Sequence, residues 1–257
     1  MKIGAQLYTV RDYAQTVPDL AVTLRKIAEM GYRTVQCSQV GPIDPYLIKE
    51  MLDENNLQCV MTHVAPDRLL NDLPTVIAEH RILGCTNIGL GAMPERYRGS
   101  LEGCLAMVRN FSPVARNIRD AGMQFHYHNH DIEFIREGRQ TLLDIFLENM
   151  PETNLLLCAF WAWASGVSPE HILSQYSGRI TAIHLKDMAV IPGCRSVGSG
   201  RTMVPVLEGN MDYISIVNAA ENCGVDFALV EQDTCQESPF TCLQKSLANL
   251  QSIGCRT

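Results

Sequence analysis

The sequence predicts a (β/α)₈ barrel that forms one domain over residues 1–257. Short apolar segments recur along the chain, and amphipathic segments with helical periodicity separate them. The length of 257 residues is also usual for a single barrel of this kind. An unbroken alternation of strand and helix favours a closed barrel over an open doubly wound sheet.

The expected strands are short and mostly apolar on both faces, which is typical of the buried strands of a parallel sheet. In chain order they are Ile3–Leu7, Thr34–Cys37, Gln58–His63, Asn87–Leu90, Gln124–His128, Leu155–Ala159, Ile180–Leu185 and Phe227–Glu231. The segments Val17–Met30 and Ser238–Ile253 repeat apolar residues at helical spacing. Glycines suited to helix C-terminal caps or the turns after them stand at Gly31, Gly84, Gly122, Gly178 and Gly224.

A dinucleotide-binding fold has no support, because no G-x-G-x-x-G follows the first strand. One connection stands out by its length. Residues Met188 to Asn210, between the seventh strand and its helix, form a segment long enough to fold over the barrel mouth.

Charge and hydropathy restrict the partners of the protein. The formal net charge is −7, whereas a protein that binds the phosphates of a nucleic acid needs a basic surface. No apolar run approaches the roughly 20 residues that a membrane-spanning helix requires. We therefore expect neither a nucleic acid nor a membrane as a partner. The net charge is compatible with a small-molecule substrate, which we expect instead.

The ten cysteines are spread along the chain without a C-x₂-C pair, so we expect reduced thiols. The amino terminus enters a strand-like segment, Lys2–Thr9, which leaves no room for a signal peptide. Both observations favour a cytoplasmic location.

Polar residues gather where the predicted strands end. His63 ends the third strand, His128 the fifth and Glu231 the eighth, and His184 lies in the seventh. Five of the seven histidines lie at or near such an end, while His80 and His171 fall in helical segments. In a barrel of this kind the carboxyl ends of the strands carry the active site. Each residue alone could form a buried hydrogen-bonded pair or a salt bridge, but together they indicate a metal site.

Alternation along a strand places His126, His128 and His130 on one face. At most two of them can reach one ion, because a strand rises about 3.3 Å per residue. We favour His128, at the expected strand end, as the metal ligand, and His126 as a residue that packs inside the barrel.

Five segments of the chain resemble the xylose isomerase-like sugar phosphate isomerases and epimerases, close to the inosose dehydratase-like branch. They are GAQLYTVRD (4–12), HNHDIEF (128–134), GRITAIHLKDM (178–188), EGNMDY (208–213) and VEQD (230–233). The resemblance implies a (β/α)₈ barrel, a divalent metal ion bound at the ends of strands 5 to 8, and a small keto-sugar, polyol or inositol-derived substrate. It also implies a possible homodimer.

Carried over residue by residue, the resemblance assigns His184 and Glu231 as metal ligands, with His128 in a position where many members have glutamate. The sixth strand departs from the family. Similar members read LDVGWVHRAGVDP, whereas residues 157–169 read LCAFWAWASGVSP, which places Cys158 at the aspartate ligand and Trp163 at the histidine. A thiolate ligand would favour Zn²⁺ over Mn²⁺. The alternatives are a three-ligand site without Cys158 and a site that has lost its metal.

The chemistry implied by the resemblance is removal of a proton from the carbon next to a carbonyl, through an enediolate that the metal stabilises as a Lewis acid. We expect Glu231 to move one proton, and Glu133 or a histidine to take the second such role. Lys186 is expected to hold a substrate oxygen or the developing enolate. The substrate-binding residues are expected to be Tyr8, His63, His130 and Trp161.

The prediction is thus a metal-dependent isomerase or epimerase of carbohydrate metabolism. One alternative is a lyase similar to inosose dehydratase, which forms the same enolate and expels water. A second is a metal-free sugar-binding barrel that lost catalysis when Cys158 replaced the aspartate. An endonuclease of this barrel superfamily is the least favoured, given the acidic charge and too few ligands for a multinuclear zinc site.

Overall fold

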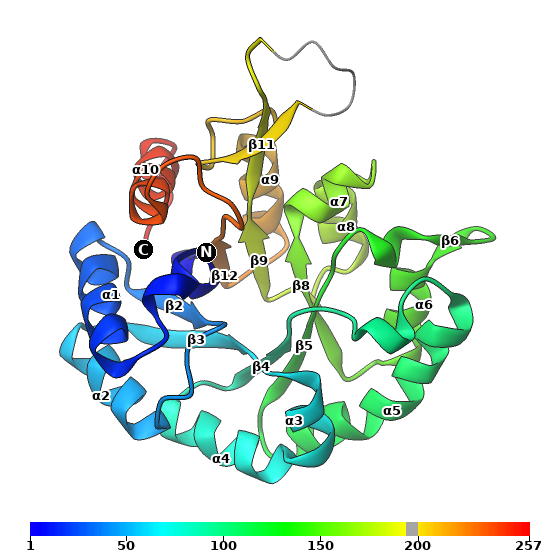
Figure 1. The fold of residues 1–257 in the computed structure, drawn as a ribbon. Coiled ribbons are helices and arrows are strands. Elements are labelled where there is room, and N and C mark those ends of the chain that lie inside the picture. The colour runs from blue at the N-terminus through cyan, green and yellow to red at the C-terminus, as the bar shows by residue number, and fades with distance from the viewer. Residues whose placement is uncertain (194–199) are drawn as a thin grey trace.

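The protein is a closed parallel barrel of eight strands, with helices packed around it as an outer ring (Figure 1). The computed structural model describes residues 1–193 and 200–257. Around the barrel the strands follow the order β1-β12-β9-β8-β5-β4-β3-β2. The fold class predicted from the sequence is confirmed.

The barrel strands are β1 (Lys2–Gln6), β2 (Thr34–Cys37), β3 (Gln58–His63), β4 (Asn87–Leu90), β5 (Gln124–His128), β8 (Thr153–Cys158), β9 (Ala182–Leu185) and β12 (Phe227–Val230). The predicted bounds are right to within two residues. The sixth strand begins earlier than expected, at polar residues whose partners on β5 complete the ladder: Thr153 pairs with Phe125 and Asn154 with His126. Hydropathy alone does not reveal such a start.

The helices of the ring are α1 (Val17–Met30), α2 (Pro45–Glu54), α3 (Pro66–Asn71), α4 (Leu73–Leu83), α5 (Leu101–Asp120), α6 (Leu142–Asn149), α7 (Ala159–Ala164), α8 (Pro169–Gln175), α9 (Tyr213–Asn222) and α10 (Pro239–Ser252). Three short 3₁₀ turns, η1 (Leu7–Tyr13), η2 (Glu95–Tyr97) and η3 (Ile132–Phe134), follow β1, β4 and β5. The five glycines expected after helices all have positive φ, which suits glycine because it lacks a Cβ. Among the described residues, no helix is both long and apolar enough to cross a membrane.

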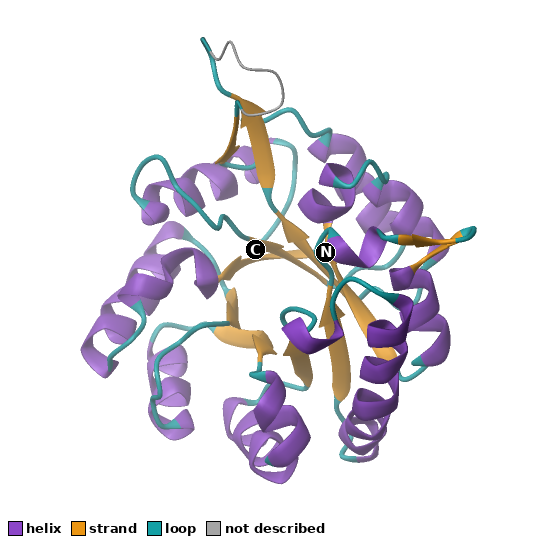
Figure 2. Cartoon of the chain, turned by 45° about the vertical axis from the view of Figure 1, so that its right-hand side comes forward, coloured by secondary structure: helices purple, strands orange, loops and turns teal. Residues whose placement is uncertain are grey.

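In the described part of the chain, two pairs of antiparallel strands lie outside the barrel. One pairs β6 (Arg136–Glu137) with β7 (Gln140–Thr141), and the other pairs β10 (Asp187–Val190) with β11 (Arg201–Val204). The second is formed by the long connection between the seventh strand and its helix. Its strands extend away from the barrel rather than across the mouth (Figures 1 and 2), and residues 194–199 of this segment lie outside the described part of the chain. The C-terminal segment returns to the barrel, where Arg256 pairs with Lys2.

Toward the carboxyl ends of the strands, an apolar layer of the barrel interior gives way to polar side chains. A cluster of buried apolar residues fills one level and contains Val60, Met61, Leu156, Ala182 and Leu229. Side chains two positions apart on a strand share a face. Leu156, Ala182 and Leu229 are therefore followed, on the same inward face, by Cys158, His184 and Glu231. Because side chains alternate along a strand, these three point into the barrel at the carboxyl ends of their strands, which is where barrel active sites lie.

Asp187 anchors the connection that follows β9. Its carboxylate accepts hydrogen bonds from four backbone N–H groups, those of Met188 (2.8 Å), Leu207 (3.0 Å), Gly209 (3.0 Å) and Met211 (3.4 Å). A Cβ on Gly209 would lie 2.2 Å from Oδ1 of Asp187, so only glycine fits there. The aspartate of the HLKD segment is therefore a structural residue that holds the base of the β10–β11 hairpin.

We expect Asp187→Asn and Asp187→Ala both to lower the free energy of unfolding, by about 3 kcal/mol or more, because buried N–H groups lose their acceptor. The amide of asparagine offers one oxygen and turns an NH₂ group toward two other donors. Asp226→Asn, at an exposed position, is the matched control. Denaturant unfolding of the three variants measures the effect, and an Asp187→Asn protein within about 1 kcal/mol of wild type would contradict it.

Candidate functional site

A cavity of about 440 Å³ opens at the carboxyl ends of the strands. The predicted site residues that line it are Tyr8, His63, His128, His130, Lys186 and Glu231. Sequence reasoning missed Ser38, Arg98 and Asp233, which also line it. Asp233 could have been found from its place two residues beyond Glu231, whereas the loop positions of Ser38 and Arg98 carry no pattern that separates them from ordinary surface residues.

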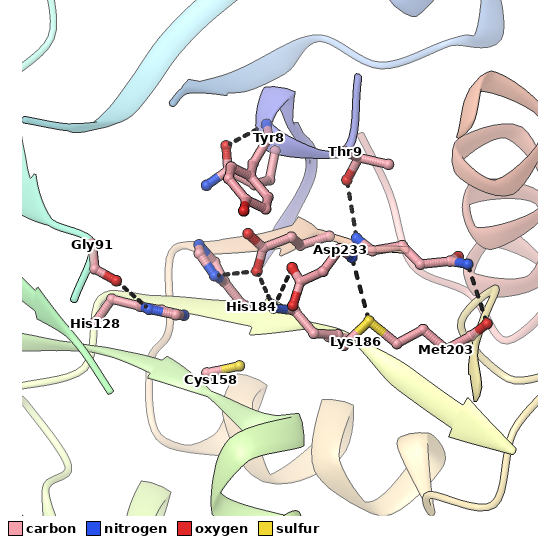
Figure 3. A network of polar contacts seen from close by, with 12 residues as sticks. Tyr8, Thr9, Gly91, His128, Cys158, His184, Lys186, Met203 and Asp233 are labelled. Carbon is pink, nitrogen blue, oxygen red and sulfur yellow. Dashed lines mark hydrogen bonds and ion pairs between the residues drawn. The ribbon is translucent and has the colours of Figure 1, made fainter. Parts of the chain in front are cut away.

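Three predicted metal ligands meet at this mouth. One donor atom of each of His128, His184 and Glu231 lies within 4.8 Å of the other two, and all three residues are buried. Figure 3 shows the side chains of His128 and His184 close to Lys186 at the ends of their strands. The centroids of the two imidazole rings are 4.5 Å apart.

His128 and His184 each use one ring nitrogen in a hydrogen bond to a neighbouring residue, which leaves the other nitrogen for the metal site. Nδ1 of His128 lies 2.9 Å from the carbonyl oxygen of Gly91, and Nε2 of His184 lies 2.6 Å from Oε1 of Gln36. These oxygens only accept, so each held nitrogen carries the proton and the other presents a lone pair. Orientation of this kind by an outer hydrogen bond is usual for histidines that bind metal ions.

The donor atoms themselves lack well-aligned hydrogen bonds within the described part of the chain. Nε2 of His128, Nδ1 of His184 and Oε2 of Glu231 are all buried without a well-aligned hydrogen bond, although Oε2 also lies 2.9 Å from the ammonium of Lys186. Nδ1 of His184 lies 3.0 Å from Oε2 of Glu231, yet the two are not aligned as a hydrogen bond. Buried polar atoms normally have hydrogen-bond partners, so two imidazole nitrogens without one, close to a carboxylate oxygen, fit a cation between them.

Lys186 brings a fixed positive charge to the same place. Its buried ammonium forms ion pairs at 2.9 Å with Oε2 of Glu231 and at 2.8 Å with Oδ1 of Asp233. Burial alone would lower the pKa of Lys186, but the carboxylate of Glu231 and its other neighbours raise it well above its usual value. Burial raises the pKa of Glu231, but Lys186, His184 and His128 together hold the pKa of that carboxyl well below its usual range. Both groups are therefore charged at neutral pH.

Three histidines at the mouth, His63, His128 and His130, are neutral at pH 7. Burial is the main cause that lowers the pKa of His128 well below its usual value, that of His63 to about 3 and that of His130 to about 4. Neutral imidazole is the form that binds a metal ion. His126 lies deeper, fully buried with Nε2 3.1 Å from Oδ1 of Asn87, which confirms the predicted packing role.

The side chain of Cys158 points into the barrel, as predicted, and Cys158 pairs in register with His184 on the neighbouring strand. Its sulfur, however, is not part of the group formed by His128, His184 and Glu231, whose donor atoms lie within 4.8 Å of one another. Burial raises the pKa of Cys158 to about 12, so the side chain is a neutral thiol at pH 7. Figure 3 shows it beside His128 and His184. Its assignment as a ligand stays a prediction.

Trp161, on α7, stands behind the mouth. Its ring centroid lies 5.5 Å from that of His130, and the ammonium of Lys186 lies 5.8 Å from the indole ring. The indole therefore packs against two residues of the cavity. Tyr8 is on the opposite side, where Arg11 stacks on its ring at 4.2 Å.

Glu133 does not reach the cavity lining. It is fully buried on η3, where Oε1 accepts a hydrogen bond from the hydroxyl of Tyr127 and Oε2 accepts one from the backbone N–H of His130 at 2.7 Å. The carboxylate is therefore neither exposed on the surface nor open to the cavity. The side chain turns back toward the outside of β5 because the chain makes a 3₁₀ turn after His130. Glu133 is placed to position His130 rather than to touch a substrate.

We expect Glu133→Gln to fold well, because an amide can accept from His130 and donate to the hydroxyl of Tyr127. Glu133→Ala should lower the free energy of unfolding by about 2–4 kcal/mol, since two buried donors lose their acceptor. Burial raises the pKa of Glu133. The carboxyl thus contributes stability at low pH that is lost as pH rises through its folded-state pKa.

Relative to wild type, Glu133→Gln should therefore gain stability as pH increases from about 4 to 7. Denaturant unfolding across this range measures the difference, with the exposed Glu137→Gln as control. A difference that stays flat or falls with pH would show that burial of the charge is not the main cause of the pH dependence.

Comparison with known proteins finds the same barrel in solved structures of low sequence identity. A sugar phosphate isomerase/epimerase from Parabacteroides distasonis aligns with a TM-score of 0.77 at 21% identity, over 98% of this chain and 93% of that chain. The probable 3-DHS dehydratase AsbF from Bacillus anthracis aligns with a TM-score of 0.74 at 15% identity, over 98% and 99%. A D-allulose 3-epimerase from Methylomonas sp. aligns with 0.73 at 15%, over 98% of each chain.

No protein-family model matches the chain, and no curated protein matches its sequence. At identities of 21% and below, the structural likeness establishes the fold only. The reaction has to be argued from the residues at the barrel mouth. The resemblance seen in the sequence is confirmed at this level. The chain shares the barrel fold of these sugar phosphate isomerase/epimerase structures and of a xylose isomerase domain protein from Alicyclobacillus acidocaldarius.

Proposed function

We propose that this protein is a metal-dependent isomerase or epimerase of a small keto-sugar or polyol-derived substrate. The observation that supports this most is a set of three buried donor atoms without well-aligned hydrogen bonds, on His128, His184 and Glu231, beside a cavity of about 440 Å³ that His128 and Glu231 line. Two imidazoles and one carboxylate are a donor set found in catalytic Zn²⁺ and Fe²⁺ sites. The residues present therefore fit a divalent ion, and Mn²⁺ or Zn²⁺ is the proposed cofactor.

A bound ion would supply Lewis-acid stabilisation of negative charge on the carbonyl oxygen of the substrate. The chain would supply the proton transfer. Glu231 lines the cavity, and it approaches both His184 and Lys186 through Oε2, so the other oxygen, Oε1, is the proposed base. Its low pKa keeps the carboxylate ionised at neutral pH, which is the form that can accept a proton.

Lys186 would hold the substrate oxygen that becomes negative in the enediolate. Its ammonium is already charged and fixed between Glu231 and Asp233, so little reorganisation is needed when charge develops. We assign the second proton transfer to His130, which lines the cavity and has an unpaired buried Nδ1. Glu133 would then act through His130, because it holds the backbone of that residue.

The proposal predicts exchange of carbon-bound hydrogen with solvent. Metal-loaded protein in D₂O is incubated with D-fructose, D-tagatose, D-allulose, L-ribulose and their phosphates, and NMR detects deuterium at the carbon next to the carbonyl. Incorporation that Glu231→Gln abolishes and the exposed Glu50→Gln retains supports the isomerase or epimerase. Metal-loaded protein that exchanges no hydrogen in any of these ketoses contradicts it.

A lyase is the second candidate, favoured by the structural likeness to the probable 3-DHS dehydratase. The same base and the same ammonium would form the enolate, and a leaving hydroxyl would depart as water. Mass spectrometry of the same reactions separates the two, because a dehydratase product is lighter by one water molecule while an isomer has unchanged mass.

A further inference from the structure

The three proposed ligands leave room for another donor, and His63 faces them from the other side of the mouth. The barrel order places β3, which ends at His63, four strands from β9, which carries His184. Nδ1 of His63 lies 3.1 Å from Oγ of Ser38, and its buried Nε2 has no hydrogen-bond partner among the described residues. His63 therefore repeats the pattern of His128 and His184, with one nitrogen held and the other buried and unpaired.

The separations of the three imidazole rings suit a common ion. The ring centroid of His63 is 5.5 Å from that of His128 and 5.7 Å from that of His184. With a Zn–N distance of about 2.1 Å, an imidazole centroid lies about 3.2 Å from the ion. Two rings on one ion then have centroids about 4.5 Å apart at an angle of about 90° and about 5.5 Å apart at about 120°. The observed separations fall close to these values.

The end of β4 is shaped around the ring of His63. A Cβ on Gly91 would lie 2.7 Å from Nδ1 of His63, and one on Gly89 would lie 3.0 Å from Cδ2. A side chain at Gly91 would push the imidazole out of place, whereas a Cβ on Gly89 would first meet the backbone carbonyl oxygen of Thr62, at 2.4 Å. The carbonyl oxygen of Gly91 also holds His128, so one backbone segment fixes the positions of two imidazoles.

We infer that His63 is a fourth ligand of the ion, which would then be bound by three imidazoles and one carboxylate. The inference rests on the metal site proposed above. Nε2 of His63 is not among the donors that lie within 4.8 Å of one another, so binding requires the ring to turn toward the ion. Imidazole-rich sites suit Zn²⁺ better than Mn²⁺, which prefers oxygen ligands. The missing ligand of the sixth strand is thereby replaced from across the barrel rather than by Cys158.

Zn²⁺ binding to the full chain tests this directly, using competition with a chromophoric chelator for affinity. His63→Ala and His63→Gln should weaken Zn²⁺ binding at least about 100-fold, more than loss of an outer-shell partner costs. The glutamine retains a polar contact to Ser38 and guards against a folding defect. Cys158→Ser and the exposed His171→Ala should bind Zn²⁺ as the wild type does.

X-ray absorption of the Zn²⁺-loaded protein provides an independent readout. We expect only nitrogen and oxygen neighbours at about 2.0–2.1 Å, with no sulfur at about 2.3 Å, and fewer imidazoles in His63→Gln. Wild-type affinity in both His63 variants, or a sulfur neighbour that Cys158→Ser removes, would overturn the inference while leaving the metal site intact. Absence of Zn²⁺ binding to the wild type would instead refute the proposed metal site, and this inference with it.

Discussion

Lys186→Met is expected to bind the divalent ion more tightly than the wild type while losing about 10²- to 10³-fold in turnover. The ammonium lies 2.9 Å from Oε2 of Glu231, a proposed ligand atom, so it repels an ion bound to the same oxygen. The same ammonium is the proposed partner of the developing enolate, and methionine cannot replace that charge. Metal affinity and turnover should therefore move in opposite directions.

Without the ion, Lys186→Met should also be less stable, by about 3–5 kcal/mol, because a buried carboxylate loses its counter-charge. Addition of Zn²⁺ should recover much of this loss, since the ion supplies the missing positive charge. Lys245→Met is the matched control: Lys245 pairs with Glu237 on the surface, where such pairs contribute little. Equal metal affinity in Lys186→Met and wild type would show that the ammonium and the ion do not share Glu231.

Glu231→Gln should reduce metal affinity by at least about 10³-fold and abolish hydrogen exchange, because one residue supplies both a ligand oxygen and the proposed base. The amide oxygen that remains is a weaker, uncharged ligand. Isothermal titration of metal-free protein with Zn²⁺ and Mn²⁺ measures the first effect. Glu50→Gln, an exposed carboxylate on α2, should match the wild type in both assays.

The two readouts of Glu231→Gln also separate the roles of the side chain. Loss of exchange that persists when the variant is saturated with metal would assign the base to Glu231. Recovery of exchange at high metal concentration would leave Glu231 as a ligand only and contradict the assignment of the base. Unchanged metal affinity would remove Glu231 from the metal site altogether.

The barrel could be predicted from the sequence because its strands are buried on both faces and remain apolar over most of their length. Strand phase then placed His184 and Glu231 correctly, since each lies two residues beyond an apolar residue on the inward face. The Met188–Asn210 segment is long enough to fold over the mouth, but in its described part Asp187 and the pairing of β10 with β11 direct the hairpin outward, and Met203 contacts Gln232 and Asp233 at the rim.

Residues beyond the strand ends were harder to place. Glu133 follows His128 by only five positions, yet a 3₁₀ turn directs its carboxylate to Tyr127, and no periodicity reports such a turn. Gln36, on β2, contacts the imidazole of His184, and Ser38, just after β2, contacts that of His63. Both contacts join residues that are far apart in the sequence. Pairings of this kind depend on how the strands close into a barrel, so a single sequence does not reveal them.

The central claim is that His128, His184 and Glu231 hold one divalent ion. Anomalous diffraction from crystals grown with Zn²⁺ or Mn²⁺ tests it most directly. We expect one peak per chain at the barrel mouth, about 2.0–2.2 Å from Nε2 of His128, Nδ1 of His184 and Oε2 of Glu231. A mouth without an anomalous peak in crystals soaked with either metal, or a peak that none of these three atoms contacts, would contradict the claim.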